Sequence, residues 1–328
     1  MIQVCEVPFE DSRAQELWEV QQQEMIDRYG DSAIEPPLMP EGQIASFVGV
    51  TPDGETVATA AVRWASDPQI PPGAAEIKRL FVVADHRGHG HSRVLMGAAE
   101  AAARRAGATS VVLETGTAQP EAIALYESIG YHRIPNYGYY RDDPESVCFA
   151  RELPTRVLVI NGTIGAGKTS VAGAVSTLLT ERGSRYGYID GDYLCQAQPH
   201  SSDDPYHQRL FFDNLAAVAP QYRARGCGIM VIARVVEDEA DRNRYRRALA
   251  TSGTPAEVTI VRITASEDTR LARITAREPE GHWQEWASVR TVELEQALDD
   301  LGLDDAVVTN EGRSPRETAE ELLDSIGW

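Results

Sequence analysis

The chain has 328 residues, of which 42% are hydrophobic and 25% are charged, and this ordinary globular composition excludes a disordered or fibrous chain. Its 31 basic and 50 acidic residues give a net charge of −19, which argues against a protein that binds nucleic acid or an anionic membrane through a basic surface. At roughly 150 residues per domain, the length predicts two domains.

The first half of the chain is predicted to mix helices and strands. A turn is expected at Pro52-Asp53-Gly54, and Pro120 and Gly130 mark the start and the end of a short helix. The proline-rich segment 35–40 is expected to be a loop. The predicted helices are 11–29, 91–106 and 120–129, and the predicted strands are 44–50, 56–65, 76–84 and 109–114.

A glycine-containing turn follows the predicted strand 76–84 and runs from Asp85 to Ser92. A strand, a glycine turn and a helix start together direct backbone N–H groups and the positive end of a helix dipole at one point. This geometry binds a pyrophosphate. The turn also contains His86, His89 and His91, but their spacing fits no common zinc pattern, so no metal site is expected there.

Several motifs of residues 1–152, in their order and spacing, resemble the GNAT superfamily of acetyl-CoA-dependent N-acetyltransferases. The pattern Arg-x-x-Gly-x-Ser from Arg87 to Ser92 is similar to the pyrophosphate loop of that superfamily. The preceding AEIKRLFV resembles its fourth strand, and LETGTAQPEAIALYESIGYHRI resembles its fifth strand and the helix after it. The resemblance implies a mixed-sheet α/β fold and acetyl-CoA as the acetyl donor.

The same resemblance implies roles for individual residues. Tyr126 matches the general acid that protonates the leaving thiolate, although it is also consistent with a packed helix residue. Glu76 and Glu114 are candidates for the base that deprotonates the amine, unless they are structural. The edge of strand 80–83 is expected to pair with the pantetheine arm, and Tyr137, Tyr139 and Tyr140 either line the acceptor pocket or pad a strand. The residues implied to bind acetyl-CoA are Phe81, Val83, Arg87, Gly88, His89, Gly90, His91 and Ser92.

The domain boundary is predicted within 151–155, which divides the chain into 1–152 and 153–328. The second part alternates apolar runs with helical stretches, a pattern that predicts a parallel sheet flanked by helices. Its predicted strands are 156–161, 186–190, 228–233, 257–263 and 305–309.

A phosphate-binding loop follows the first of these strands. The segment from Gly162 to Thr169 matches GxxxxGK[ST] between a strand and a helix, the context that a P-loop NTPase fold requires. In such loops the lysine, here Lys168, reaches the β- and γ-phosphates of ATP, and the Thr169 hydroxyl binds Mg²⁺. The residues predicted to bind ATP are Gly162, Gly165, Ala166, Gly167, Lys168, Thr169 and Ser170.

The chain contains only two lysines, Lys78 and Lys168, among its 31 basic residues. Lysine and arginine differ in shape and chemistry. Two readings follow for a chain dominated by arginine: lysine is kept where a compact ammonium is needed, or the two lysines are left over from codon bias. The P-loop explains Lys168. No mechanism demands lysine at position 78.

The second part resembles P-loop small-molecule kinases such as adenylylsulfate kinase, gluconokinase and chloramphenicol phosphotransferase. In YIDGD, at the end of the second strand, the resemblance implies Asp192 as the base for an acceptor hydroxyl and Asp190 as a metal ligand. Residues 269–278 resemble the arginine-bearing helix and lid. Arg273 and Arg277, with Arg270 on the same face, would neutralise the transferring phosphoryl group, or form only a solvated face.

The kinase resemblance has one departure and leaves one region open. The third strand ends at Arg234 without an acidic residue, and Glu237 and Asp238 follow too late to be assigned as substitutes. The loop from Asn310 to Arg313 is expected near adenine. Residues 193–225 are expected to form the acceptor region, with Asp203, Asp204, Tyr206 and Arg209 as possible contacts.

These features predict a bifunctional enzyme that acetylates an amine and phosphorylates a hydroxyl, with acetyl-CoA, ATP and Mg²⁺. The expected partners are small molecules, such as an antibiotic or another secondary metabolite, with no nucleic acid or membrane partner and the oligomeric state left open. Two alternatives remain: an acetyltransferase regulated by an ATP-sensing domain, and a protein or peptide acetyltransferase. Four cysteines without CxxC spacing and no long apolar run predict a cytoplasmic protein.

Overall fold

The computed structural model describes residues 2–30, 37–199 and 202–328. The chain divides into two units, Met1–Leu153 and Pro154–Trp328, and each is described here by itself. Glu35 and Pro36 of the expected proline-rich loop lie outside the described residues. Among the residues described, no helix has the length and apolar character needed to cross a membrane.

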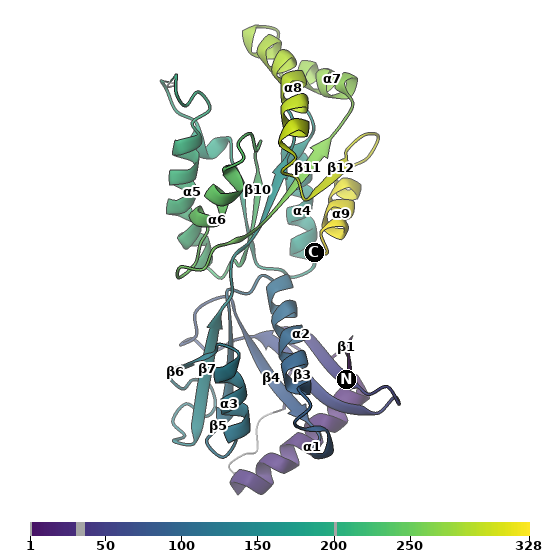
Figure 1. The fold of residues 1–328 in the computed structure, drawn as a ribbon, viewed down its shortest axis with the longest axis vertical. Coiled ribbons are helices and arrows are strands. Elements are labelled where there is room, and N and C mark those ends of the chain that lie inside the picture. Colours follow the sequence, from purple (N-terminus) through teal and green to yellow (C-terminus); the bar gives the residue numbers. More distant parts are fainter. Residues whose placement is uncertain (1, 31–36, 200–201) are drawn as a thin grey trace. The chain divides into compact units, whose positions relative to one another are not determined.

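Unit 1 is built on a seven-stranded mixed sheet with the order β1-β2-β3-β4-β5-β7-β6 (Figure 1). Strands β4 and β5 run parallel, and the other neighbouring strands are antiparallel. The elements are β1 (Gln3–Val7), α1 (Ser12–Tyr29), β2 (Gln43–Val50), β3 (Thr56–Trp64), β4 (Ala74–Val82), the 3-10 turn η2 (Ala84–His86), α2 (His91–Arg105), β5 (Ser110–Gly116), α3 (Pro120–Ser128), β6 (His132–Ile134) and β7 (Ser146–Glu152).

The sheet of unit 1 opens between β4 and β5. Strand β4 pairs with β3 as far as Val82, but its pairing with β5 stops at Ile77. Beyond that point β5 continues to Gly116 alongside β7. A register shift against β3 and a positive φ of 55° at Arg79 mark an irregularity in β4 just after the separation. On the side away from β3, the residues of β4 that follow Ile77 therefore face an open edge rather than β5.

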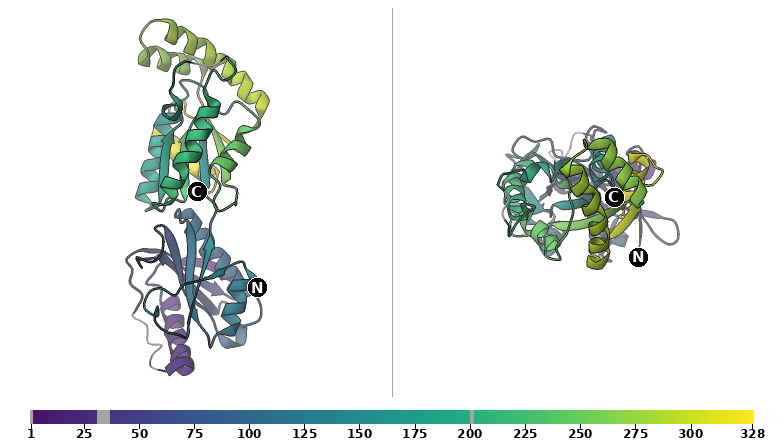
Figure 2. Two further views of the ribbon diagram at one scale, coloured as in Figure 1. Left: turned by 90° about the vertical axis from the view of Figure 1, so that its left-hand side faces the viewer. Right: turned by 90° about the horizontal axis from the view of Figure 1, so that it is seen from above.

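Unit 2 contains a five-stranded sheet with the order β12-β11-β8-β10-β9, and all of its neighbouring strands are parallel. Helices cover both faces of the sheet, and α7 and α8 lie together at one end of the unit (Figures 1 and 2). The elements are β8 (Arg156–Asn161), α4 (Lys168–Glu181), β9 (Tyr186–Asp190), η3 (Tyr193–Cys195), α5 (Gln208–Arg223), β10 (Ile229–Ala233), α6 (Asp241–Ala248), β11 (Glu257–Thr264), α7 (Glu267–Arg277), α8 (His282–Leu301), β12 (Ala306–Thr309) and α9 (Pro315–Ser325).

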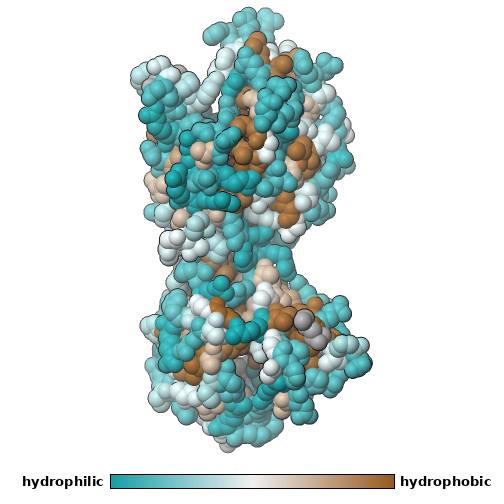
Figure 3. Space-filling view, viewed as in Figure 1, coloured by the Kyte–Doolittle hydropathy of each residue, from teal (hydrophilic) through white to brown (hydrophobic). Residues whose placement is uncertain are grey.

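The two sheets confirm the predicted fold class, a mixed sheet in the first half and a parallel sheet with helices in the second. Central strands such as β8 and β10 are buried along almost their whole length, because helices cover both faces of a parallel sheet. The surface visible in Figure 3 is mainly hydrophilic, with hydrophobic side chains in separate patches.

Candidate active sites

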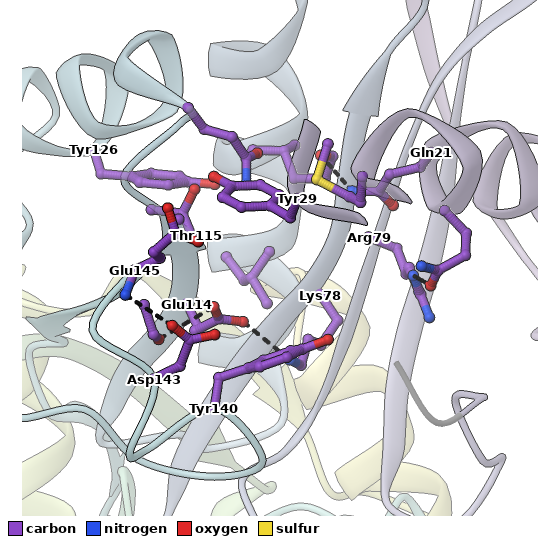
Figure 4. Close-up of a pocket in the computed structure, with 17 residues that line it drawn as sticks. Gln21, Tyr29, Lys78, Arg79, Glu114, Thr115, Tyr126, Tyr140, Asp143 and Glu145 are labelled. Carbon is purple, nitrogen blue, oxygen red and sulfur yellow. Dashed lines mark hydrogen bonds and ion pairs between the residues drawn. The ribbon is translucent and has the colours of Figure 1, made fainter. Parts of the chain in front are cut away.

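A cavity of about 120 Å³ lies in unit 1 where β4 and β5 separate (Figure 4). One wall comes from β4 after Ile77, and another from the end of β5. Helix α1 supplies Gln21, Gln22, Met25 and Tyr29, and α3 supplies Tyr126. The opening of the sheet thus brings together side chains from four elements.

Tyr126 lines this cavity from α3 and is buried. Its ring packs against Tyr131 and Phe149, with centroid distances of 6.1 and 5.6 Å. Burial, followed by the charge of Glu114, raises the pKa of the Tyr126 hydroxyl well above its usual value. The hydroxyl is therefore protonated at neutral pH and has a proton to donate. Figure 4 shows the side chain pointing into the same space as Tyr29.

The two base candidates occupy different places. Glu114 lines the cavity and accepts a hydrogen bond from Ser146 Oγ at 3.3 Å. Glu76 is not among the described residues that line it. The Glu76 side chain is 12% exposed and accepts a hydrogen bond from the Tyr137 hydroxyl at 3.1 Å. Lys78 Nζ lies 3.8 Å from each carboxylate. Of the two candidates, Glu114 is the one that lines the same cavity as Tyr126.

The three candidate acceptor tyrosines also separate. Tyr140 lines the cavity. Tyr137 is buried, and its hydroxyl donates to Glu76. Tyr139 is exposed, and its ring makes an edge contact with the ring of Tyr140. Three lining residues just before or at the start of β7 were not predicted, because only the fold brings this segment beside β5. They are Asp143, Glu145 and Ser146.

The predicted pyrophosphate loop runs from η2 into α2. Gly88 and Gly90 have φ values of 79° and 80°, and α2 begins at His91. The first N–H groups of a helix have no partner within it, so they are available to an anion. The Arg87 side chain instead braces the loop, because it donates to Val82 O at 2.9 Å and to Glu24 at 2.5 Å. Burial lowers the pKa of His91, which favours a neutral ring.

The open edge of β4 differs from the expected one. Val83 donates its N–H to Val57 O at 2.9 Å, and its carbonyl accepts from His86 N at 3.0 Å, so both of its backbone groups are used within the unit. Because alternate residues of an antiparallel strand direct their N–H and C=O groups to the same edge, Leu80 and Val82 face away from β3. The carbonyl of Val82 already accepts from Arg87 Nε at 2.9 Å and that of Leu80 from Gln21 Nε2 at 3.3 Å. These two residues, rather than Phe81 and Val83, therefore direct their N–H groups to the open edge.

Unit 2 holds a larger cavity of about 1360 Å³ around the phosphate-binding loop. The loop is held from several sides. Asn161 Oδ1 accepts hydrogen bonds from Gly162 N at 2.8 Å and Val236 N at 2.9 Å. Asn310 Nδ2 donates to Ala166 O at 2.9 Å, which places the start of the predicted adenine loop directly beside the phosphate loop.

Lys168 and Thr169 lie at the start of α4. Lys168 Nζ donates to the carbonyl oxygens of Gly162 and Thr163 at 2.9 and 3.0 Å. Burial lowers the pKa of Lys168 to about 8. Thr169 Oγ1 donates to Asp190 Oδ2 at 3.2 Å, so a hydroxyl and a carboxylate oxygen lie side by side. Oxygen atoms of this kind are the ligands that Mg²⁺ prefers, and the two residues fit the predicted metal role.

Two acidic residues of the cavity remain for other roles. Asp192 lines it with a side chain that is 72% exposed, and lies 3.3 Å from Arg234 Nη1. Glu237 also lines it and pairs with Arg290, and burial raises the pKa of Glu237. An acidic residue beyond the third strand therefore does reach the site. Asp238 does not, because it pairs with Arg244 at 2.7 Å.

The three arginines of α7 lie in different surroundings. Arg273 and Arg277 line the cavity. Arg273 donates to Gly165 O and Ala166 O, both at 3.2 Å, so it stabilises the loop, whereas Arg277 is largely exposed. The expectation for Arg270 is wrong, because its buried guanidinium donates to Ala265 O at 2.9 Å and Glu295 at 2.5 Å.

Of the four predicted acceptor contacts, Asp203, Asp204, Tyr206 and Arg209, one lines the cavity. Tyr206 lines the cavity. Asp204 instead accepts from Gln208 N at 2.7 Å at the start of α5, and Asp203 pairs with Arg209. The sequence analysis did not identify several further lining residues, although the spacing of three of them along α8 offered a signal. These are Gln208, Arg234, Trp283, Trp286 and Arg290.

Comparison with known proteins assigns the two units separately. Residues 9–131 match the acetyltransferase (GNAT) family, and residues 158–295 match an AAA domain. The first match confirms the resemblance of unit 1 to GNAT acetyltransferases. The second supports the resemblance of unit 2 to P-loop kinase-like domains.

Curated relatives match only a part of the chain. An IAA acetyltransferase from Azospirillum brasilense is 38% identical over 81 residues, which cover 25% of this chain and 53% of that protein. N-acetyltransferase 8 from Mus musculus is 36% identical over 80 residues, or 24% and 35% of the two chains. The chain thus spans about half of the first relative and a third of the second.

Among solved structures, a GNAT-family acetyltransferase from Staphylococcus aureus is 14% identical with a TM-score of 0.36, and the match covers 47% of this chain and 99% of that one.

Proposed function

We propose that unit 1 transfers an acetyl group from acetyl-CoA to an amine and that unit 2 transfers the γ-phosphoryl group of ATP to a hydroxyl. The acceptors would be small molecules in the cytoplasm. For unit 1, the observation that carries the proposal is the shared cavity of Tyr126 and Glu114 at the open edge of β4. For unit 2, it is the shared cavity of Lys168, Thr169 and Asp192.

In unit 1, the backbone of residues 88–92 would hold the CoA pyrophosphate at the start of α2. The open edge at Leu80 and Val82 would bind the pantetheine arm. Glu114 accepts a proton from the attacking amine, either directly or through a water molecule. When the tetrahedral intermediate collapses and the C–S bond breaks, Tyr126 donates its proton to the departing thiolate.

In unit 2, the Lys168 ammonium would leave its loop carbonyls for the β- and γ-phosphates. Thr169 and Asp190 would hold Mg²⁺, which supplies positive charge to the same phosphates. Asp192 accepts the proton of the acceptor hydroxyl while that oxygen bonds to the γ-phosphorus. Arg277 offsets the negative charge on the transferring group.

The test separates a kinase from a domain that only senses ATP. Because Asp192 is exposed and projects into the cavity, Asp192→Asn is expected to leave ATP affinity nearly unchanged. Phosphoryl transfer to hydroxylated metabolites should fall by roughly 10²–10⁴-fold. Asp203→Asn, at an acidic residue that does not line the cavity, is the matched control. If Asp192→Asn transfers phosphate at the normal rate, or if the unaltered protein binds ATP without any transfer, the proposal for unit 2 is wrong.

A further inference from the structure

Two tryptophans of α8 form an aromatic pair on the wall of the unit 2 cavity. The ring centroids of Trp283 and Trp286 are 4.7 Å apart with 23° between the ring planes, and both side chains line the cavity. Trp283 is 60% exposed. Tyr206 lines the same cavity and adds a second exposed ring. Large apolar rings gathered at a cavity and left exposed indicate a binding surface.

Contacts connect Tyr206, and Arg290 of α8, to the proposed base. Arg290 follows the tryptophans on the same face of α8, and its guanidinium lies 5.3 Å from the centroid of the Tyr206 ring. The Tyr206 carbonyl accepts a hydrogen bond from Arg234 at 3.1 Å, and Arg234 lies 3.3 Å from Asp192. We call the region with Asp192, Tyr206, Arg234, Glu237, Arg290 and the two tryptophans the acceptor half of the cavity.

The charges of the acceptor half are balanced internally. Arg234 is paired with Asp192, and Arg290 is paired with Glu237. The Arg234 side chain is only 7% exposed, and its three nitrogens donate to Gln208 Oε1, Gly191 O and Tyr206 O at 3.1–3.3 Å. The Arg290 side chain is 19% exposed, and its two terminal nitrogens lie beside Glu237 and Glu293. Arginine binds carboxylates and phosphates through paired N–H donors, and both arginines of the acceptor half already direct theirs at groups of the chain.

The lysine and the other arginines that line the cavity lie outside the acceptor half. Lys168 and Arg273 contact carbonyls of the phosphate loop, and their positive charge matches the phosphates of ATP. Arg277, at the end of α7, pairs with Glu278 at 2.7 Å. The acceptor half therefore offers flat aromatic faces, a carboxylate that can accept a proton, and no net charge.

We propose that the phosphoryl acceptor is an uncharged, hydroxyl-bearing molecule with a ring whose apolar face stacks on Trp283 while its hydroxyl is directed toward Asp192. This inference rests on the proposed phosphotransferase function of unit 2. Sugars and aryl alcohols share the required chemistry. Anionic acceptors such as sugar acids and nucleoside monophosphates do not.

The test measures phosphoryl transfer from labelled ATP by the full chain to four sets of compounds: neutral sugars, aryl alcohols, sugar acids and nucleoside monophosphates. Transfer is expected to the neutral sugars or to the aryl alcohols. The set that reacts shows whether the acceptor is a sugar or an aryl alcohol. Trp283→Ala should raise the KM for the reacting alcohol by about 3- to 10-fold, because ring stacking contributes that much affinity. The KM for ATP should stay the same. Val289→Ala, at an exposed position of α8 outside the cavity, should change neither value.

Each other outcome counts against a specific claim. Transfer confined to the anionic sets would overturn this inference and leave the phosphotransferase function standing. An unchanged acceptor KM in Trp283→Ala would also overturn this inference. So would a change in the KM for ATP alone, because the Trp283 ring would then stack on adenine. Transfer to no compound of any set would contradict the phosphotransferase function and this inference with it.

Discussion

Among the tyrosines near the unit 1 cavity, Tyr126 is buried and also lines the cavity together with Glu114. Tyr126→Phe removes only the hydroxyl and keeps the ring packed on Tyr131 and Phe149. We expect kcat for acetyl transfer to fall by roughly 10²-fold or more, since a general acid contributes about that much, with little change in the KM for acetyl-CoA. Tyr139→Phe, at an exposed position outside the cavity, is the control. A normal kcat in Tyr126→Phe would show that the residue serves only in packing.

The pKa of Lys168 makes ATP binding depend on pH. In the free protein burial lowers this pKa to about 8, whereas phosphates favour the ammonium. We expect uptake of only about a quarter of a proton on ATP binding at pH 7.5, and uptake of about 0.9 proton at pH 9, with affinity falling as the pH rises above 8. Isothermal titration in buffers of different ionisation enthalpy measures this uptake. Equal affinity and no uptake at both pH values would contradict the assignment.

The same shift affects the stability of the free protein. Between about pH 8 and the usual lysine value of 10.5, the unfolded chain binds the Lys168 proton more tightly than the folded chain. The contribution of Lys168 to the free energy of unfolding therefore becomes more favourable as the pH rises through this window.

Both lysines of the chain line a cavity, Lys78 in unit 1 and Lys168 in unit 2. The sequence explained only Lys168, because the P-loop is a local motif. The place of Lys78, 3.8 Å from both Glu76 and Glu114, depends on the pairing of β4 with β5. A compact ammonium can lie between these two carboxylates, where a longer, planar guanidinium fits less readily.

In the phosphate loop, the backbone conformation and the neighbours of Gly162, Gly165 and Gly167 leave no room for a side chain. Gly165 has a φ of 81°, and a Cβ there would lie 2.7 Å from the carbonyl oxygen of Arg270. Gly165→Ala should lower the melting temperature, since the left-handed conformation alone costs about 1–2 kcal/mol, and should weaken ATP binding.

Gly173 in α4 offers the matched comparison. A Cβ at this position would have no heavy atom within 4 Å, so Gly173→Ala should stabilise the helix by about 0.5–1 kcal/mol and leave ATP binding unchanged. Thermal unfolding and ATP titration of both variants check the pair. Equal effects of the two substitutions would show that the loop tolerates a side chain.

The elements predicted best from the sequence are those whose burial produces a recognisable pattern in consecutive residues. Central strands such as β8 and β10 are continuous apolar runs because they are covered on both faces. The strands β1 and β6 were not predicted, since they are edge strands with few buried side chains. The sequence analysis missed Trp283, Trp286 and Arg234 as lining residues of the unit 2 cavity for another reason. The segments that carry them lie far apart in the chain and meet at the cavity only after folding.

At the scale of the whole molecule, two units with separate cores carry two candidate sites. The motifs of each site lie within one unit, which is why the linear sequence revealed both of them. The identity of the acceptors was not accessible in this way, because it depends on lining residues brought together by the fold, such as Glu114 with Tyr140 and Trp283 with Tyr206.

The central claim is that one chain holds two independent transferase sites. The most direct test incubates the full chain with acetyl-CoA, MgATP and a metabolite library, and detects acetylated and phosphorylated products by mass spectrometry. We predict both product types for the unaltered protein, loss of phosphorylation alone for Lys168→Ala, and a strong decrease of acetylation alone for Tyr126→Phe. Loss of both activities in either folded variant, or the absence of any phosphorylated product from the unaltered protein, would contradict the claim.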